Sequence, residues 1–490
     1  MMAAVAAVDG HDALSTRSPA RADRLSPVVL LFLLCVILPV RFYAGPLLLT
    51  NLRVFLLLLI VPLGINLLRG RYGPVLVTDW AIGVHLLWQV MALAVTTPES
   101  VVTQTGSSGA EFVGGYLVGR AFIRTSAQFY AFARLLAWTL LLVFPLTLYE
   151  LNTGHSLILD VLSSLPGVGT EHHNNMEGRM GFERVQMSFP HPIHFGLFAC
   201  SVLSIVFVGL KGDVSSKLRW AAGGVIAFST FASLSSGALL PMLLQIGLIG
   251  WAWALRAVRR RWLVLLALFV LAYVVIDLLS NRTPIRVMMS YATFNAHTAY
   301  WRGIIFDWGI LNIFGSSEHG IPSARLFGIG LSDWVRPHFM NSASVDNYWL
   351  LTGMRFGIPG FLTIAFAWFW TLWKIGRLDF AGDASLKRTR LAWVFTFVAL
   401  ALTLCTVHIW SATYSYVYFL FGAGMWLFDA RPGQLTTPSG EGEEAPVRSA
   451  GRYTRFGGEW PQTASRSSSA AGPGAPLRRS PSQKASRFSR

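Results

Sequence analysis

The sequence predicts an all-α integral membrane protein with about twelve transmembrane helices. Of its 490 residues, 53% are hydrophobic and only 13% are charged, whereas soluble domains carry about 25% charged residues. Apolar runs long enough to cross a bilayer, which takes about 20 residues, occur along most of the chain. Short turns that contain Lys and Arg separate them, and this alternation is typical of a polytopic helical membrane protein.

The apolar runs give the expected positions of the spans. In chain order they are 27–44, 47–68, 74–96, 106–123, 133–151, 191–210, 218–234, 237–255, 262–280, 346–373, 390–408 and 411–428. Glu111 and several glycines dilute the fourth span, and the seventh is short. The polar residues 1–26 form an expected cytoplasmic segment. The run that follows lacks a small-residue cleavage pattern, so we assign it as a membrane helix and not as a signal peptide.

The basic residues predict the side of the membrane that each turn faces. With the N-terminus in the cytoplasm, Lys and Arg gather in the inner turns, while the outer turns 97–105, 235–236 and 409–410 carry none. Two long segments, 152–190 and 281–345, then lie on the periplasmic side of a bacterial inner membrane. The net charge of +16 therefore reflects topology, and nucleic acid is not an expected partner.

Arginines in these outer segments do not follow from topology. Arg179, Arg184, Arg302 and Arg336 lie where the orientation rule requires no positive charge. Guanidinium groups bind phosphate oxygens through two parallel hydrogen bonds, so we expect an anionic substrate. A loop of 65 residues between spans, 281–345, is also long enough to indicate a functional role.

The segment 183–196 leads into the sixth predicted span. Its two prolines disfavour regular helix, so we expect Arg184 on an extended stretch at the membrane edge. His191 and His194 have a spacing that could suit a metal, but no further Cys or His follows at ligand spacing. We therefore interpret them as packing and capping residues and expect no metal site.

Two further candidates lie beside the long outer loop. Residues 300–308 predict an amphipathic helix at the membrane interface, where Arg302 either extends its charge toward water or binds phosphate. Asp346, at the mouth of the next span, either takes part in chemistry or complements the helix dipole. The residues alone leave both pairs of alternatives open.

Four motifs occur along the chain in a characteristic order. They are an Arg before FPHPIHFG at 189–196, SSGALL at 235–240, Arg302 followed by LFGIG at 326–330, and DNYWL at 346–350 followed by GIPG at 357–360. In this order, with this topology and loop, they resemble the O-antigen ligase and polymerase family of bacterial envelope proteins. The family includes polymerases of exopolysaccharide and capsule repeat units, and the resemblance covers roughly residues 25–430.

The resemblance implies an all-helical fold similar to GT-C membrane glycosyltransferases, acting on a glycan carried by undecaprenyl diphosphate. The roles implied by position are the diphosphate ligands Arg184 and Arg302 and the base Asp346. Candidate supporting residues of the site are Asn347, His338, Arg336 and His191. Family ligases typically have His where this chain has Asp346. That difference favours a polymerase, which joins lipid-linked repeat units, over a ligase, which transfers finished polymer to lipid A-core.

The expected reaction needs neither a metal nor a nucleotide cofactor. The donor already carries a good leaving group, and the outer loops show no closely spaced acidic pair. Arginines would stabilise the departing diphosphate, and a carboxylate would accept the proton of the acceptor hydroxyl. Expected partners are undecaprenyl-diphosphate glycans, membrane lipid, and the flippase and chain-length regulator of the same pathway. A transporter is the alternative from another class, but carriers are usually built from two related halves, and we find no such repeat.

The C-terminal region differs in composition from the rest of the chain. Residues 431–490 are rich in Ser, Pro, Gly, Ala and Arg and contain few large apolar residues. Such a segment cannot bury enough apolar surface to fold by itself. We therefore predict a disordered, basic cytoplasmic tail.

Overall fold

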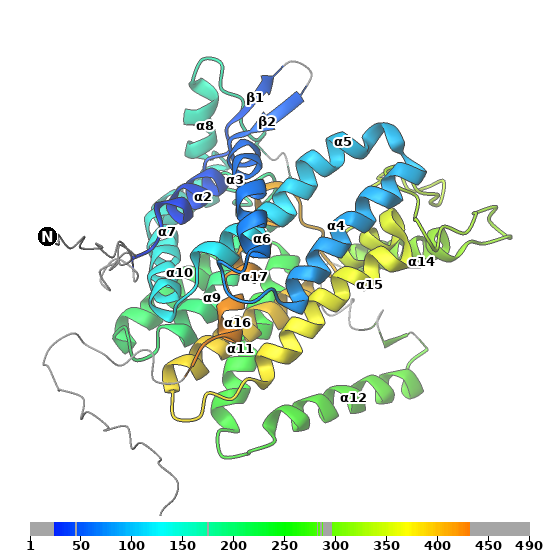
Figure 1. The fold of residues 1–490 in the computed structure, drawn as a ribbon. Coiled ribbons are helices and arrows are strands. Elements are labelled where there is room, and N and C mark those ends of the chain that lie inside the picture. The colour runs from blue at the N-terminus through cyan, green and yellow to red at the C-terminus, as the bar shows by residue number, and fades with distance from the viewer. Residues whose placement is uncertain are drawn as a thin grey trace, which may run out of the picture. The chain divides into compact units, whose positions relative to one another are not determined.

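The computed structural model describes residues 24–431, apart from 45–46, 174–175, 282, 285–286 and 288–295. The described chain is mostly helical (Figure 1) and contains one small antiparallel sheet, formed by β1 (Arg41–Ala44) and β2 (Leu47–Thr50). Nearly all of the predicted N-terminal segment 1–26 and of the predicted tail 431–490 lies outside the described residues.

Each of the twelve predicted spans overlaps a helix. In chain order these are α2 (Pro27–Ile37), α3 (Asn51–Leu68), α4 (Val77–Thr96), α6 (Ala110–Phe122), α7 (Ser126–Thr153), α9 (Pro192–Ser204), α10 (Ser216–Ala232), α11 (Ser236–Ala254), α12 (Arg261–Leu279), α15 (Tyr348–Arg377), α16 (Ala384–Thr403) and α17 (Ser411–Gly422). The connecting segments contain α5 (Val101–Gln104), α8 (Leu157–Ser164) and α14 (Ala296–Phe314). Short 3₁₀ or π turns are η1 (Pro98–Ser100), η2 (Thr105–Gly109), η3 (Ile205–Gly209) and η4 (Met425–Phe428).

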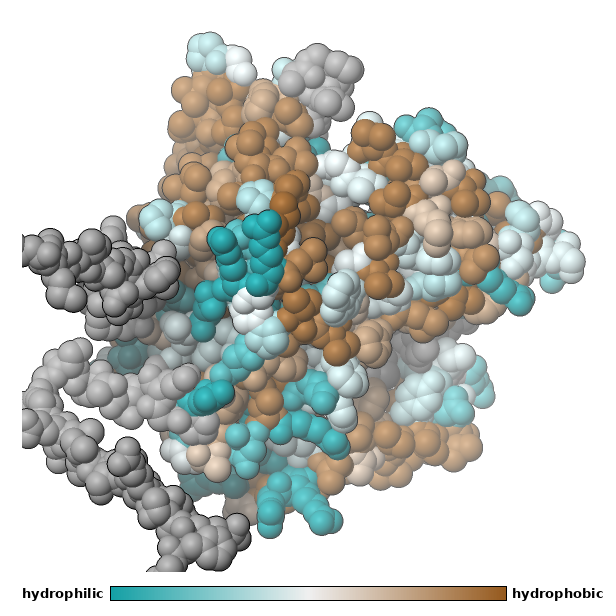
Figure 2. All heavy atoms as spheres, viewed as in Figure 1, coloured by the Kyte–Doolittle hydropathy of each residue, from teal (hydrophilic) through white to brown (hydrophobic). Residues whose placement is uncertain are grey.

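Seven of the described helical segments are long and apolar enough to cross a membrane. They are α3, α4, α7, α9 continued through η3, α11, α12 and α15. The helices in the other five predicted spans, α2, α6, α10, α16 and α17, are shorter or less apolar. Figure 2 shows mostly apolar side chains over α2, α3 and α12, as expected for surfaces that face lipid.

The first predicted span, 27–44, is wrong at its C-terminal end. Helix α2 ends at Ile37, and the chain turns into the β1–β2 hairpin. Pro39 cannot continue the helix because it has no N–H. The side chain of Asn51 then closes the turn, since its Nδ2 donates to the carbonyl oxygen of Leu38 at 2.7 Å. The apolar composition of this run does not distinguish a short strand from the last turns of a helix.

The core of the bundle lies around α17 and α9. Every residue of α17 from Thr413 to Gly422 is buried, as is every residue of α9 except Ile193. Aromatic rings fill much of this core, for example Phe32 of α2, which stacks on Phe419 of α17 with 4.5 Å between ring centroids. Helix α15 packs along α4 and α16. Its N-terminal end is bonded to the core, since the hydroxyls of Tyr348 and Tyr418 lie 2.8 Å apart and Trp349 Nε1 donates to Ala401 O at 2.9 Å.

Helix α15 is broken in its N-terminal half, at Gly357. Gly357 has φ 73° and ψ −177°, a conformation that is essentially restricted to glycine. Pro359 follows and has no N–H to donate to the carbonyl of Arg355, four residues before it. That carbonyl instead accepts a hydrogen bond from Gly330 N at 3.0 Å. A backbone segment from the long connecting loop therefore replaces a bond that the helix cannot make.

The other backbone groups beside the break are also bonded from outside the helix. The pairs are Ile329 N to Met354 O at 2.7 Å, Ile358 N to Arg325 O at 2.7 Å, and Trp88 Nε1 to Phe356 O at 2.8 Å. The loop comes this close because Gly328 has φ 73°, and a Cβ there would collide with the backbone of Arg355. The LFGIG and GIPG segments are thus held side by side, because each forms main-chain hydrogen bonds with residues that flank the other.

Helix α12 stands apart from the other helices (Figure 1). The structure describes all of it, and none of its residues is buried. The contacts described for it lie in its first turn, where Trp251 Nε1 donates to Arg261 O at 3.0 Å and the ring centroids of Trp262 and Phe395 are 5.5 Å apart. The remainder of α12 presents apolar side chains on all sides.

We predict that Gly357→Ala destabilises the protein by at least about 1–3 kcal/mol, since alanine strains the backbone there and its Cβ would meet the carbonyl of Leu326. Gly376→Ala in the same helix is the matched control, because no atom lies within 4 Å of its Cβ position. The melting temperatures of the two purified variants are measured by heating samples and quantifying the remaining folded protein by size-exclusion chromatography. Equal melting temperatures would contradict the proposed need for glycine at the break.

Candidate functional site

The two long connecting segments meet in the structure. His191 lies in the electrostatic field of Arg184, Asp346 and Arg179. Arg302 lies in the field of Asp346 and Arg179. The structure therefore brings together four of the residues singled out from the sequence, Arg184, His191, Arg302 and Asp346, although they are up to 162 positions apart, from 184 to 346.

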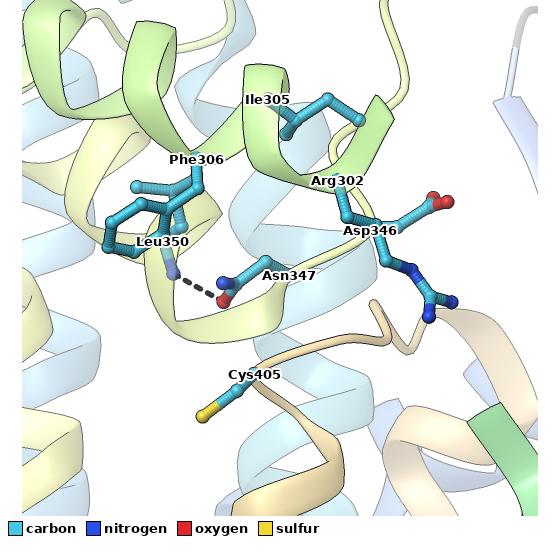
Figure 3. A pocket seen from close by; sticks show the side chains of 7 residues that line it. All are labelled: Arg302, Ile305, Phe306, Asp346, Asn347, Leu350 and Cys405. Carbon is cyan, nitrogen blue, oxygen red and sulfur yellow. Dashed lines mark hydrogen bonds between the residues drawn. The ribbon is translucent and has the colours of Figure 1, made fainter. Parts of the chain in front are cut away.

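Three of the predicted site residues line one small pocket (Figure 3). Arg302 comes from α14, and Asp346 and Asn347 are the two residues just before α15. The other lining residues are Ile305, Phe306, Leu350 and Cys405. In Figure 3 the carboxylate of Asp346 and the guanidinium of Arg302 point in different directions, and the described structure shows no ion pair between them. Both charges thus remain available to a ligand.

Arg302 is buried without a full set of hydrogen bonds. Its side chain is 8% exposed, and its Nε and Nη1 have no hydrogen-bond partner among the described residues. Burial lowers the pKa of the guanidinium, and the Asp346 carboxylate opposes that effect. A charge extended toward water would be exposed, so this geometry disfavours that alternative. Buried donors without partners are costly, and an anion that accepts from them would remove the cost.

Asn347, and not Asp346, makes the capping contact of α15. Asn347 Oδ1 accepts a hydrogen bond from Leu350 N at 2.9 Å, the geometry of a helix N-cap. Asp346 lies one residue earlier, its side chain is exposed, and it accepts a hydrogen bond from Ser344 Oγ at 2.9 Å. The carboxylate of Asp346 is therefore not committed to the helix end and is reachable from the pocket.

Arg184 lies on a non-helical stretch before α9, as predicted. Its side chain is 8% exposed, and Nη1 lies 2.8 Å from the sulfur of Met176. Burial and the nearby positive charge of Arg179 lower the pKa of Arg184 to about 10. The group still carries its charge at neutral pH, and Arg179 places a second positive charge near it.

The main chain of this stretch is anchored on α7. The carboxylate of Glu150, only 3% exposed, accepts from Gln186 N at 2.7 Å and from Met187 N at 3.1 Å. Ser156 Oγ donates to Met187 O at 2.5 Å, and Met187 has a positive φ of 54°. These contacts hold a strained turn in place and fix the backbone on which Arg184 lies.

Arg179 also belongs to this group of charges, although the sequence singled it out only as an arginine in an outer segment. Its Nη1 donates to Leu234 O at 2.9 Å, and its charge acts on Arg184, His191 and Arg302. Its place in the same segment as Arg184 is the signal that could have identified it.

Arg336 and His338, the other predicted supporting residues, do not line this pocket. Arg336 binds Asp333 through Nη1 at 2.6 Å and the carbonyl of Met340 through Nε at 3.1 Å. The hydrogen bond from Arg336 lowers the pKa of Asp333. His338 is exposed and packs against the ring of Phe339. These contacts organise the loop itself.

A larger apolar pocket adjoins the charged one. Its volume is about 550 Å³, and it shares Phe306, Asn347, Leu350 and Cys405 with the small pocket. Its remaining walls come from α11, α14, α15 and the end of α16, and nearly all of them are apolar. The charged pocket and the apolar cavity are thus neighbours that share four lining residues.

The site combines buried cations, an exposed carboxylate and an adjacent apolar cavity. Such a site fits a molecule that has both an anionic group and a hydrocarbon part. Within the described residues, no cluster of three or more His, Cys, Asp or Glu side chains could hold a metal ion. Comparison of the sequence with known protein families and with curated proteins finds no match.

We predict that Glu150→Ala loosens the stretch that carries Arg184, because two buried N–H groups lose their acceptor at a cost of about 1–3 kcal/mol. Trypsin cleavage after Arg179 and Arg184, followed by mass spectrometry on the purified protein, should then accelerate roughly 5- to 150-fold. The control is Glu177→Ala, which alters an exposed carboxylate in the same segment. Unchanged cleavage in Glu150→Ala would show that other contacts hold the stretch.

Proposed function

We propose that the protein is a polymerase of bacterial surface polysaccharide. It transfers a glycan from undecaprenyl diphosphate to the acceptor sugar of another lipid-linked repeat unit, at the periplasmic face of the inner membrane. The observation that carries the proposal is the buried Arg302 guanidinium, with two unpartnered nitrogens, beside an exposed carboxylate and an apolar cavity. A polyprenyl diphosphate has an anionic group joined to an apolar chain, which matches a cationic pocket beside an apolar cavity.

The proposal assigns one role to each part of the site. Arg302 and Arg184 bind the diphosphate oxygens, and the apolar cavity holds part of the polyprenyl chain. The topology that goes with it has about twelve spans, as in GT-C glycosyltransferases, with segments 152–190 and 281–345 in the periplasm. A flippase and a chain-length regulator of the same pathway would supply the substrate and limit the product.

The reaction itself balances without a metal or a nucleotide. The acceptor hydroxyl oxygen forms a bond to the anomeric carbon as the bond from that carbon to the diphosphate oxygen breaks. Undecaprenyl diphosphate leaves with the electron pair, and Asp346 takes the hydroxyl proton. Arginines fixed before the reaction stabilise the charge that develops on the leaving group without reorganising. The carboxylate contributes a factor of about 10²–10⁴.

Deletion of the gene in its bacterial host, followed by gel analysis of surface glycan and of the lipid-linked fraction, tests the function. A polymerase deletion accumulates single repeat units on lipid. Long polymer that is intact but not attached to lipid A would instead indicate a ligase. Loss of the glycan together with trapping of repeat units on the cytoplasmic side would indicate a transporter.

We predict that Arg302→Lys and Arg184→Lys each abolish polymer formation although the charge is kept. Lysine cannot form the planar two-pronged contact with two phosphate oxygens. Arg325→Lys is the control, because Arg325 is exposed and contacts the ring and carbonyl of Phe314. Polymer is measured by complementing the deletion strain at matched protein levels. Normal polymer from either site variant would remove that arginine from the diphosphate role.

We predict that Asp346→Asn lowers the rate by about 10²–10⁴, because asparagine cannot accept the proton. Folding should be unaffected, since the N-cap of α15 is Asn347. Asp346→His should keep partial activity, as imidazole can accept a proton. The rates are measured with purified protein and lipid-linked repeat units extracted from the deletion strain. A fully active asparagine variant would mean that Asp346 acts only through the helix dipole.

A further inference from the structure

The ring of His191 is held in one orientation at the start of α9. Its Nδ1 accepts a hydrogen bond from Ile193 N at 3.1 Å, so the side chain caps the helix. A ring nitrogen that accepts a hydrogen bond carries no proton. The neutral ring must therefore hold its proton on Nε2, which is a donor and not an acceptor.

The surroundings of His191 keep the ring neutral. Burial, followed by the charges of Arg184 and Arg179, lowers its pKa to about 4, and the carboxylate of Asp346 only partly opposes this. The rings of Trp410 and His194 also lie near it, each with 6.3 Å between centroids. Protonation would also break the bond from Ile193 N, since Nδ1 would then become a donor.

The proton on Nε2 is available to a ligand. Nε2 has no hydrogen-bond partner among the described residues, and the side chain is only partly buried. His191 shares its electrostatic surroundings with the groups of the candidate site, namely Arg184, Arg179 and Asp346. An unused neutral donor thus lies within a group of cations.

We propose that His191 is a hydrogen-bond donor to the diphosphate of the substrate, acting through Nε2–H in its neutral form. This inference rests on the function proposed above. It gives His191 a role distinct from that of the arginines, because a neutral donor adds a directed hydrogen bond without adding to the positive charge already gathered there. It also excludes His191 as the base, since its only free nitrogen already holds a proton, and leaves that role to Asp346.

A neutral imidazole suits a leaving group whose charge rises during the reaction. A donor fixed in place before the reaction stabilises that charge without reorganising, and loss of one such donor costs about 10²–10³ in rate. Enzymes can use imidazole in this way when its pKa is kept low. The effect is expected mainly in kcat, because the charge on the departing oxygen is larger in the transition state than in the bound substrate.

Two substitutions separate the donor role from the capping role. His191→Asn places an amide oxygen near the position of Nδ1, so it preserves the cap but not the distant donor. His191→Gln places its amide nitrogen near the position of Nε2, so it preserves the donor but weakens the cap. We expect His191→Gln to keep a substantial part of kcat, and His191→Asn to lose about 10²–10³ with an unchanged melting temperature.

The assay uses the full-length protein in lipid nanodiscs with lipid-linked repeat units extracted from the deletion strain. Rates are measured over substrate concentration and from pH 5.5 to 8.5. Because glutamine does not titrate and His191 stays neutral throughout this range, the wild type and His191→Gln should share one pH profile. If the rate of the wild type changed with pH and that change were lost in His191→Gln, then His191 would titrate in this range, which would contradict the neutral donor.

The outcomes distinguish the two proposals. Wild-type protein that forms no polymer from the extracted units would overturn the proposed function itself. Active wild-type protein with His191→Asn at least as active as His191→Gln would overturn only the inference about His191, because the ring would then serve as a cap. Equal loss in both variants also contradicts it, since the donor position would make no difference.

Discussion

Helix α15 can be broken inside the bundle only because the main-chain groups beside the break are bonded from elsewhere. An unsatisfied backbone group in the interior of a membrane protein costs several kcal/mol. Residues 325–330 and Trp88 supply the missing partners. This requirement ties the long connecting loop to α15. It thereby fixes α14, which precedes the loop, relative to Asp346 and Asn347, and the charged pocket lies between them.

The candidate site is a concentration of positive charge in poorly solvated surroundings. Arg184 and Arg302 are each 8% exposed, and taking an ion out of water costs several kcal/mol. Arg179 adds to the repulsion, and the described structure supplies Asp346 as the nearby opposing charge. The rigid fold around the site sustains this arrangement. A diphosphate would relieve the repulsion and would accept from the unsatisfied donors of Arg302, which is the physical reason for proposing an anionic ligand.

Local sequence signals predicted much of the fold. Apolar runs located the helices, and proline placed Arg184 on a non-helical stretch. The resemblance pointed to Arg302 and Asp346, which share one pocket. Features that depend on distant contacts could not be predicted. From their chemistry alone, Arg302 and Arg336 are equivalent arginines of one loop, and the structure separates them by burying Arg302 at the pocket and bonding Arg336 within the loop. Asn347 and Asp346 are adjacent, and only the hydrogen bond from Leu350 shows which one caps α15.

The isolation of α12 bears on how the protein would respond to the lipid around it. A span whose hydrophobic length differs from the bilayer thickness adjusts by tilting. Because no residue of α12 is buried and the contacts described for it lie in its first turn, its tilt can change without repacking of the core. Differences in thickness between membranes can therefore be taken up at α12 before they act on the packed core.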